Sequence, residues 1–236
     1  MRNYIELNGK SSAEINGLLI QELPPISKPK MRTQIDTIDG RAGDIVTQLG
    51  FAAYDKTIEI GLYGDFDLDD VISYFNSSGQ VVFSNEPDKY YNYQILDQID
   101  FQRLIRFRTA KVKMHVQPFK YSSVEGTKTF TSFTNNQITI KNNGNYFSKP
   151  IITITGSGTI NLSLNNEQVL VIDMSNASKI VIDTANMEAY NPTNQNLLNR
   201  DVTGDYNNLY LNVGSNTISW TGTITEIDIE NYSRWL

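Results

Sequence analysis

The stretch "KVKMHVQPFKYS", Lys111–Ser122, is a strand-like segment that runs into a proline. Val112, Met114 and Val116 alternate with polar residues, which is the pattern of a strand with one buried face. Pro118 has no N–H group to donate to a sheet, so we expect the strand to end there or to lie at an edge. The stretch therefore predicts the closing strand of a β-rich domain.

His115, within this stretch, is the only histidine of the chain. The alternation places its side chain on the solvated face of the strand. An imidazole acts as a catalytic base only beside an orienting partner and a nucleophile or metal. The sequence has no cysteine and no second histidine with which to build such a site. We therefore interpret His115 as a solvated strand residue.

The length and composition of the chain predict two domains. Its 236 residues exceed the common size of a single domain. Asparagine occurs six times in residues 1–124 and nineteen times in residues 125–236, so the composition changes sharply between them. The short polar stretch "YSSVEGTK" at the change suits a linker. We place the boundary at Val124 to Thr127, which gives an N-terminal domain of residues 1–124 and a C-terminal domain of residues 125–236.

The N-terminal domain is expected to be mostly strand. The pair Asn8-Gly9 between two short apolar runs predicts a tight hairpin turn. A long hairpin is predicted where "MRTQIDTI" and "IVTQLGFAAY" flank the turn "DGRAGD", residues 39–44. Further on, we expect a strand from Arg103 to Val116, with a bulge between Phe107 and Ala110 where the alternation slips.

One helix is predicted in this domain, from Asp67 to about Ser77. The apolar residues of its stripe fall at i, i+3, i+4 and i+7, namely Leu68, Val71, Ile72 and Phe75. The preceding "DFDLDD" places Asp65, Asp67 and Asp69 like the start of a calcium loop, but Asp70 and Asn76 replace the required glycine and glutamate. We interpret these carboxylates as helix-capping residues.

The C-terminal domain shows no helical period. Short runs rich in Ile, Val and Thr, such as "QITIK", "PIITITG", "QVLVID" and "LYLNV", are separated by Asn-Asn, Asn-Gly and Gly-Ser pairs. Many short strands at this spacing predict a β-sandwich or barrel. The stretch "GSGT", Gly156–Thr159, lacks the lysine and the helix of a phosphate loop, so we interpret it as a hairpin turn.

No pattern predicts an enzyme or a cofactor. The carboxylate pairs Asp173 with Asp183 and Glu226 with Asp228 could in principle hydrolyse a glycoside, but any strand protein contains such pairs. The net charge of −6 disfavours binding to nucleic acid, and the basic cluster from Arg103 to Lys113 is interpreted as a solvated or subunit-facing strand. The N-terminus has no apolar signal sequence and no apolar run long enough to span a membrane occurs, so we expect synthesis in the cytoplasm.

Several segments, in order, resemble the distal tail protein (Dit) family of long-tailed bacteriophages. In the first half these are "IELNGKSSAEINGLLIQEL", "IDGRAGD", the predicted helix, "NEPDKYYNYQIL" and "VQPFKY". The second half, with "KPIITITGSGTINLSLNN" and "LNVGSNTISWTGTITEIDIENYSRWL", resembles the galectin-like sandwich of the same family. The resemblance implies a mainly β chain: an N-terminal β-sandwich-like domain with one helix and a long hairpin, then a galectin-like β-sandwich.

The resemblance also implies a structural role without catalysis. Dit proteins form a ring of six copies at the distal end of the tail, where they join the tail tube protein to the tail-associated hub protein and in many phages to receptor-binding proteins. The expected location is therefore the virion tail tip. The alternative is a carbohydrate-binding module that recognises cell-surface polysaccharide, for which Trp220 and Trp235 would be the stacking candidates.

The long hairpin is the predicted contact between ring subunits. Its charged turn has little to bury within its own small domain, so a neighbouring copy could supply the missing surface. The interface residues predicted from this argument are Asp39, Gly40, Arg41, Gly43 and Asp44. Gly40 and Gly43 are expected to hold positive φ angles or to approach another backbone closely. An ordinary hairpin with a solvated tip within one domain is the alternative.

Overall fold

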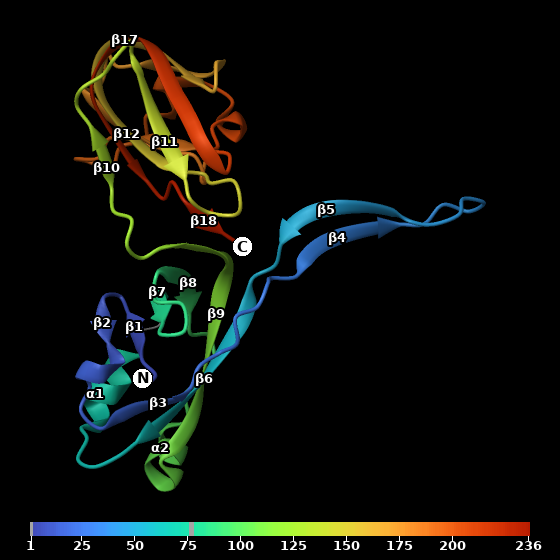
Figure 1. Cartoon of the computed structure of the whole chain (residues 1–236), viewed down its shortest axis with the longest axis vertical. Helices are drawn as coiled ribbons and strands as arrows, with labels where there is room; N and C mark the ends of the chain where they lie inside the picture. Colours follow the sequence, from blue (N-terminus) through green and yellow to red (C-terminus); the bar gives the residue numbers. More distant parts are fainter. Residues whose placement is uncertain (1, 76–77) are drawn as a thin grey trace. The chain divides into compact units, whose positions relative to one another are not determined.

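The computed structural model describes residues 2–75 and 78–236 and is mainly β, as predicted. The chain forms two compact units: the first runs to Ser123 and includes the last residue, Leu236, and the second runs from Val124 to Trp235. Each unit has its own hydrophobic core. The two units are described separately below (Figure 1).

A strongly curved sheet builds the first unit around its core. Its strands follow the order β2-β1-β7-β8-β9-β6-β3. Their bounds are β1 Ile5–Leu7, β2 Lys10–Ser11, β3 Leu18–Glu22, β6 Tyr54–Leu62, β7 Ser78–Phe83, β8 Lys89–Gln94 and β9 Thr109–Ser122. The predicted tight turn joins β1 to β2, where Asn8 and Gly9 both have positive φ angles. A short 3-10 helix, η1 Ser12–Glu14, follows β2.

The predicted helix is α1, Leu68–Tyr74. The Asp67 side chain accepts a hydrogen bond of 2.9 Å from the Asp69 N–H, which confirms the capping interpretation. Val71, Tyr74 and Phe75 are buried in the core. The helix ends earlier than the predicted Ser77, which lies outside the described residues.

A second helix, α2, Phe101–Phe107, replaces the first half of the strand that we predicted from Arg103. The Asp100 side chain caps it by accepting a hydrogen bond of 2.8 Å from the Arg103 N–H. Leu104 is fully buried and holds the helix on the sheet. The break in the apolar–polar alternation after Phe107, which we interpreted as a bulge, marks the end of this helix. There Arg108 adopts a left-handed conformation with φ 59°.

Pro118 does not end its strand, which was one of the two placements expected for it, because β9 continues through the proline to Ser122. Two features of the sheet allow this. The ladder between β9 and β6 ends at Val116, so β6 needs no N–H from Pro118. On the other side, the register with β8 shifts between Tyr91 and Tyr93, which places the proline at an irregularity.

The second unit is a β-sandwich built around two long strands, β12 Ile151–Leu164 and β17 Gly214–Glu230. The remaining strands of the sandwich are β10 Lys128–Phe130, β11 Gln137–Asn142, β13 Glu167–Asp173, β14 Lys179–Asp183, β15 Glu188–Tyr190 and β16 Val202–Gly204. A last short strand, β18 Arg234–Trp235, is not part of this sheet. The path of the sheet is β10-β17-β12-β13-β16, with β11 on β17 and β14 on β12. The predicted strand "LYLNV" is absent apart from a bridge between Leu211 and Ser148, and two short 3-10 helices, η2 Asn199–Asp201 and η3 Tyr206–Asn208, lie before it.

The stretch "GSGT" is part of a continuous strand and is not the hairpin turn that we expected. One half of β12 pairs with β14, the other half pairs with β13, and the register against β17 shifts at the glycines. A Cβ atom on Gly156 would lie 2.4 Å from the Thr223 carbonyl oxygen, and one on Gly222 would lie 2.4 Å from the Thr159 carbonyl oxygen. The glycines therefore let two long strands bend past each other, which carries both of them from one layer of the sandwich to the other.

Candidate assembly site: the β4–β5 arm and its anchor

The long hairpin forms an arm of strands β4, Met31–Asp36, and β5, Ile45–Phe51, as predicted. The two strands form a sheet of their own, and Figure 1 shows them leaving the curved sheet of the first unit as a projecting ribbon. Almost every arm residue is exposed. Such an isolated two-stranded hairpin is only marginally stable in water. At the base of the arm, the Phe51 ring packs edge-to-face on Phe119 of β9, with centroids 5.9 Å apart. The exposed strands beyond this contact form a surface that is open to a partner.

Aliphatic side chains lie in the open along the arm. Ile35 and Val46 are directly opposite each other in the register, so they share one face, and they are 58% and 55% exposed. Ile38 and Leu49 are each about half exposed as well. The facing pair of Ile35 and Val46, with Ile38 and Leu49 also exposed on the same small hairpin, is the kind of apolar exposure that marks a binding surface.

The five predicted interface residues lie together in the turn at the tip of the arm, and all are exposed. Gly40 and Gly43 both have a φ of 82°, which confirms the expected positive angles. No atom lies within 4 Å of a Cβ placed on either glycine, so conformation rather than space requires them. Asp39, Arg41 and Asp44 form no side-chain hydrogen bond or ion pair with any described residue.

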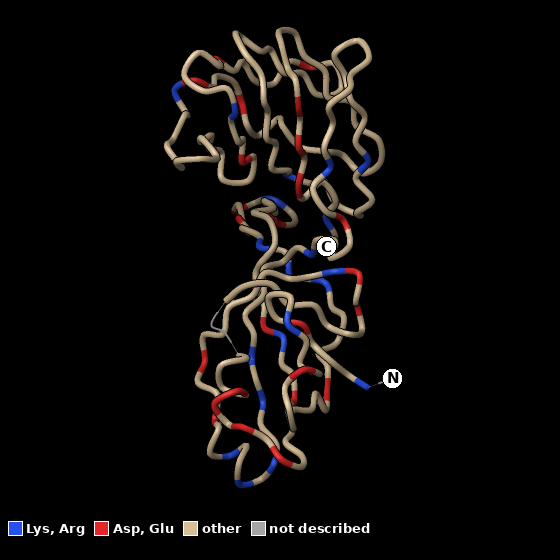
Figure 2. The backbone as a smooth tube through the Cα atoms, turned by 90° about the vertical axis from the view of Figure 1, so that its left-hand side faces the viewer, with Lys and Arg blue, Asp and Glu red and all other residues tan. Residues whose placement is uncertain are grey.

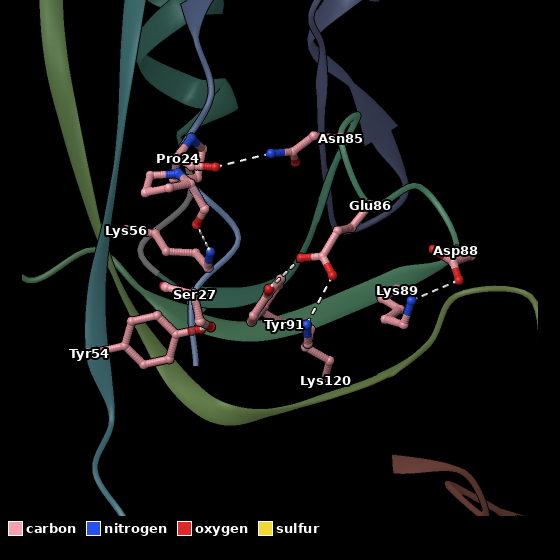
Figure 3. Close-up of polar contacts among 11 residues, drawn as sticks. Pro24, Ser27, Tyr54, Lys56, Asn85, Glu86, Asp88, Lys89, Tyr91 and Lys120 are labelled. Carbon is pink, nitrogen blue, oxygen red and sulfur yellow. Dashed lines mark hydrogen bonds and ion pairs between the residues drawn. The ribbon is translucent and has the colours of Figure 1, made fainter. Parts of the chain in front are cut away.

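The root of the arm is held by polar contacts that the sequence analysis did not identify (Figure 3). The chain enters the arm through residues 24–27, and three of their carbonyl oxygens accept hydrogen bonds. Asn85 Nδ2 donates to Pro24 at 3.0 Å, Lys56 Nζ to Pro25 at 2.9 Å, and Tyr54 Oη to Ser27 at 3.4 Å. Tyr54 and Lys56 belong to β6, which leads out of the arm. The two ends of the arm are thus tied to each other and to the turn between β7 and β8.

A buried ion pair lies beneath this root. Lys120 Nζ is 2.9 Å from Glu86 Oε1, and each side chain is only 9% exposed. The Tyr91 hydroxyl donates to the other carboxylate oxygen of Glu86 at 2.7 Å, as Figure 3 shows. Both oxygens of the buried carboxylate are therefore satisfied, which is the condition under which a buried charge is tolerated. We call Lys56, Glu86, Tyr91 and Lys120 the anchor.

Burial shifts the pKa values within the anchor. It lowers the pKa of Lys56 to about 8, because the ammonium is removed from water, while the charge of Glu86 opposes the shift. Lys56 Nζ also lies 4.9 Å from the centroid of the Tyr91 ring, a cation–π contact. Burial and the bond to Glu86 raise the pKa of Tyr91 far above its ordinary value, so this phenol remains a hydrogen-bond donor.

Parity along two strands could have revealed the anchor. Lys56 occupies the same parity of β6 as the buried Ile58 and Ile60. Lys120 likewise occupies the same parity of β9 as the buried Met114 and Val116. A lysine at an inward position needs a buried partner, but the sequence does not say that the partner is Glu86.

The residues considered for catalysis are in structural contacts. His115 lies on the polar face of β9, as predicted, with Nδ1 2.8 Å from Asp55 Oδ1. Glu226 and Asp228 both lie near Lys179 Nζ, at 3.1 and 3.7 Å.

The other carboxylates considered in the sequence are also in local contacts. Asp173 and Asp183 accept hydrogen bonds from the backbone of the turns that follow them. Within residues 2–75 and 78–236, no three His, Cys, Asp or Glu side chains are grouped so as to hold a metal ion, and no helix is long and apolar enough to cross a membrane.

These features define a class of protein: two β-rich units in tandem, of which the first carries a long, exposed hairpin. No protein-family profile and no curated protein sequence matches the chain. Solved structures do match, and the chain has the fold of SPP1 Dit (gp 19.1), described as a paradigm of the hub adsorption apparatus in phages that infect Gram-positive bacteria. The TM-score is 0.67 at 16% identity, over 100% of both chains.

Two further structures are similar to the chain over nearly its full length. A chain of the phage P2 baseplate in its activated conformation with calcium matches with a TM-score of 0.56 and 10% identity, over 100% of this chain and 99% of that one. The phage p2 baseplate with strontium gives the same score and identity over 97% of both chains. The predicted resemblance to Dit proteins is thereby confirmed at the level of the fold.

Proposed function

We propose that this chain is a structural, non-catalytic component of a bacteriophage tail tip. Six copies form a ring through their first units, and the ring connects the tail tube protein to the tail-associated hub protein. A receptor-binding protein is a further partner. The likeness to SPP1 Dit and to the baseplate chains over essentially the full length supports this proposal.

The observation that carries the proposal is the arm. A monomeric protein has no use for a hairpin that projects four aliphatic side chains and a charged turn into water. In a closed ring, each copy presents one surface and receives a different one, so a projecting arm provides a suitable head-to-tail contact. Asp39, Gly40, Arg41, Gly43 and Asp44 are the proposed interface residues at its tip.

The alternative, a carbohydrate-binding module, is less favoured by the side chains of the second unit. Sugar-binding surfaces use exposed aromatic rings. Trp220 is buried and packs edge-to-face on Phe133, with ring centroids 4.9 Å apart. Within residues 124–236, which are all described, no Trp, Tyr or Phe side chain is widely exposed.

Mass photometry of the purified chain over a range of concentrations tests the proposal. We expect a species of six times 26.7 kDa. A variant in which residues 33–49 are replaced by a short glycine turn is expected to remain monomeric with an unchanged melting temperature, because the arm lies outside the core. A wild-type chain that stays monomeric at every concentration would contradict ring formation.

A further inference from the structure

The arm is one half of a contact, and a head-to-tail ring needs a second, different surface on each copy. The tip of the arm, residues 36–45, contains Asp36, Asp39 and Asp44 against Arg41, which gives a net charge of −2. The strands behind it expose Ile35 and Val46 on one face. Its acceptor should therefore combine exposed apolar side chains with an excess of positive charge.

Helix α2 carries such a combination. Ile105 and Phe107 are 44% and 60% exposed, although Leu104 of the same helix is fully buried. Arginines surround the exposed pair, and their guanidinium carbons lie over aromatic rings: Arg106 is 5.3 Å and Arg103 5.8 Å from the Phe107 centroid. We define the α2 surface as Arg103, Ile105, Arg106, Phe107 and Arg108.

The positive charge of the α2 surface is not neutralised by nearby carboxylates. Asp100 is engaged as the cap of the helix, and Asp97 is paired with Lys113. Among the described residues, no ion pair includes Arg103, Arg106 or Arg108. Residues 101–108 thus carry a net charge of +3. Figure 2 shows this basic region as blue segments at the lower end of the first unit, where Figure 1 places α2.

The other exposed apolar residue on a helix of the first unit has the opposite surroundings. Ile72 on α1 is 41% exposed, much like Ile105. It lies close in sequence to Asp65, Asp67, Asp69 and Asp70, which would repel the acidic tip of the arm. Charge therefore distinguishes two otherwise similar helical surfaces and selects α2.

We propose that the α2 surface of one copy receives the β4–β5 arm of the next copy. This inference rests on the proposed ring and names the two surfaces that close it. Ile35 and Val46 pack against Ile105 and Phe107, and the carboxylates of the tip lie among the arginines.

Cysteine cross-linking tests the inference, since the natural chain has no cysteine to interfere. One population carries Val46→Cys and a second carries Ile105→Cys; they are mixed and treated with a short bismaleimide. The matched control replaces Ile105→Cys by Ile72→Cys, a helical position of similar exposure. A chain with both Val46→Cys and Ile105→Cys is expected to cross-link into a ladder that stops at six copies.

Native mass, measured on the same samples before cross-linking, separates the two proposals. Hexamers that cross-link between positions 46 and 105 at least tenfold faster than between 46 and 72 support the inference. Hexamers that cross-link equally or preferentially between 46 and 72 overturn it and leave the ring intact. Samples without oligomers overturn the ring and the inference together.

Charge reversal gives an independent test. Arg103→Glu with Arg106→Glu, or Asp39→Lys with Asp44→Lys, is expected to raise the concentration for half-assembly about tenfold or more. A single chain that carries all four substitutions should have a concentration for half-assembly within about threefold of the wild type. Lys141→Glu with Lys149→Glu in the second unit is the control and should have no effect. Failure of the combined variant to assemble better than either parent would overturn the pairing.

Discussion

Lys120 and Glu86 form a buried ion pair across two strands of the first unit, with Nζ 2.9 Å from Oε1 and only 9% of either side chain exposed. The pair lies directly beneath the root of the arm, since Glu86 follows Asn85, which binds the Pro24 carbonyl. It ties the turn between β7 and β8 to β9. Removing the Glu86 carboxylate should therefore lower the free energy of unfolding of the first unit.

Substitution Glu86→Ala should destabilise the first unit by about 3–5 kcal/mol, because it leaves the Lys120 ammonium buried without a counterion. Urea denaturation followed by circular dichroism measures this loss. The adjacent pair of Asp88 and Lys89 provides the control, since Asp88 is 59% exposed. Asp88→Asn should cost less than about 1 kcal/mol. Equal effects of the two substitutions would show that the buried pair has no special role.

The stability of the first unit should rise with pH from about pH 8 upward. The pKa of Lys56 is lowered to about 8 in the folded chain and has its ordinary value of 10.5 in the unfolded chain. Between these values the unfolded state binds more protons, so raising the pH favours the folded state, by up to about 1.4 kcal/mol per pH unit. Below pH 8, Lys56 is charged in both states and the contribution is constant.

The matching measurement compares the wild type with Lys56→Met between pH 7 and pH 10. The difference in unfolding free energy between them should change over this interval, with the wild type gaining on the variant. Taking the difference cancels the titration of the other groups. Parallel pH profiles would show that Lys56 is not desolvated as described.

Gly43→Val combined with Asp44→Lys should impair assembly more than folding. Valine is strained at a φ of 82°, by about 1 kcal/mol or more, but the tip contacts no core residue of the first unit. We expect the melting temperature to change little while mass photometry shows monomers. Persistent hexamers, or a chain that simply unfolds, would count against the tip as a subunit contact.

Gly222→Ala should destabilise the second unit by more than about 2 kcal/mol, because the new Cβ atom would lie 2.4 Å from the Thr159 carbonyl oxygen. Gly214→Ala is the matched control on the same strand: its φ of 92° is close to the 97° of Gly222, but nothing lies within 4 Å of its Cβ position. The control should lose only about 1 kcal/mol, the cost of the left-handed backbone. Thermal unfolding of both variants provides the comparison.

Local patterns in the sequence predicted much of the fold. The arm follows from two strand-capable runs around Gly40 and Gly43, and α1 follows from the spacing of Val71 and Phe75. Helix α2 was missed because it has only seven residues, and its Leu104, Ile105 and Phe107 were counted as part of the strand that follows. The bend at Gly156 was mistaken for a turn, since a glycine pair does not reveal whether a neighbouring strand crosses it.

The candidate site was predictable only in part. The tip residues are contiguous in sequence, so their placement together required only the hairpin. The anchor joins residues from four segments, and the partner of Lys120 lies 34 positions away at Glu86. No periodicity encodes such a pairing. Likewise, the arginines near residue 105 were predicted on a strand, where they would have alternated with Ile105 and Phe107 instead of surrounding them on one helix.

The anchor also gives the arm a mechanical connection. Glu86 binds Lys120 near the end of β9, and β9 ends at Ser122, one residue before the first unit itself ends. A force applied to the arm would act on the hydrogen bond between the Pro25 carbonyl and Lys56 of β6. The hydrogen bonds between β6 and β9 would then transmit this force to β9 as shear. Tension therefore reaches the first residue of the second unit along a continuous hydrogen-bonded strand, with only a single intervening residue to stretch.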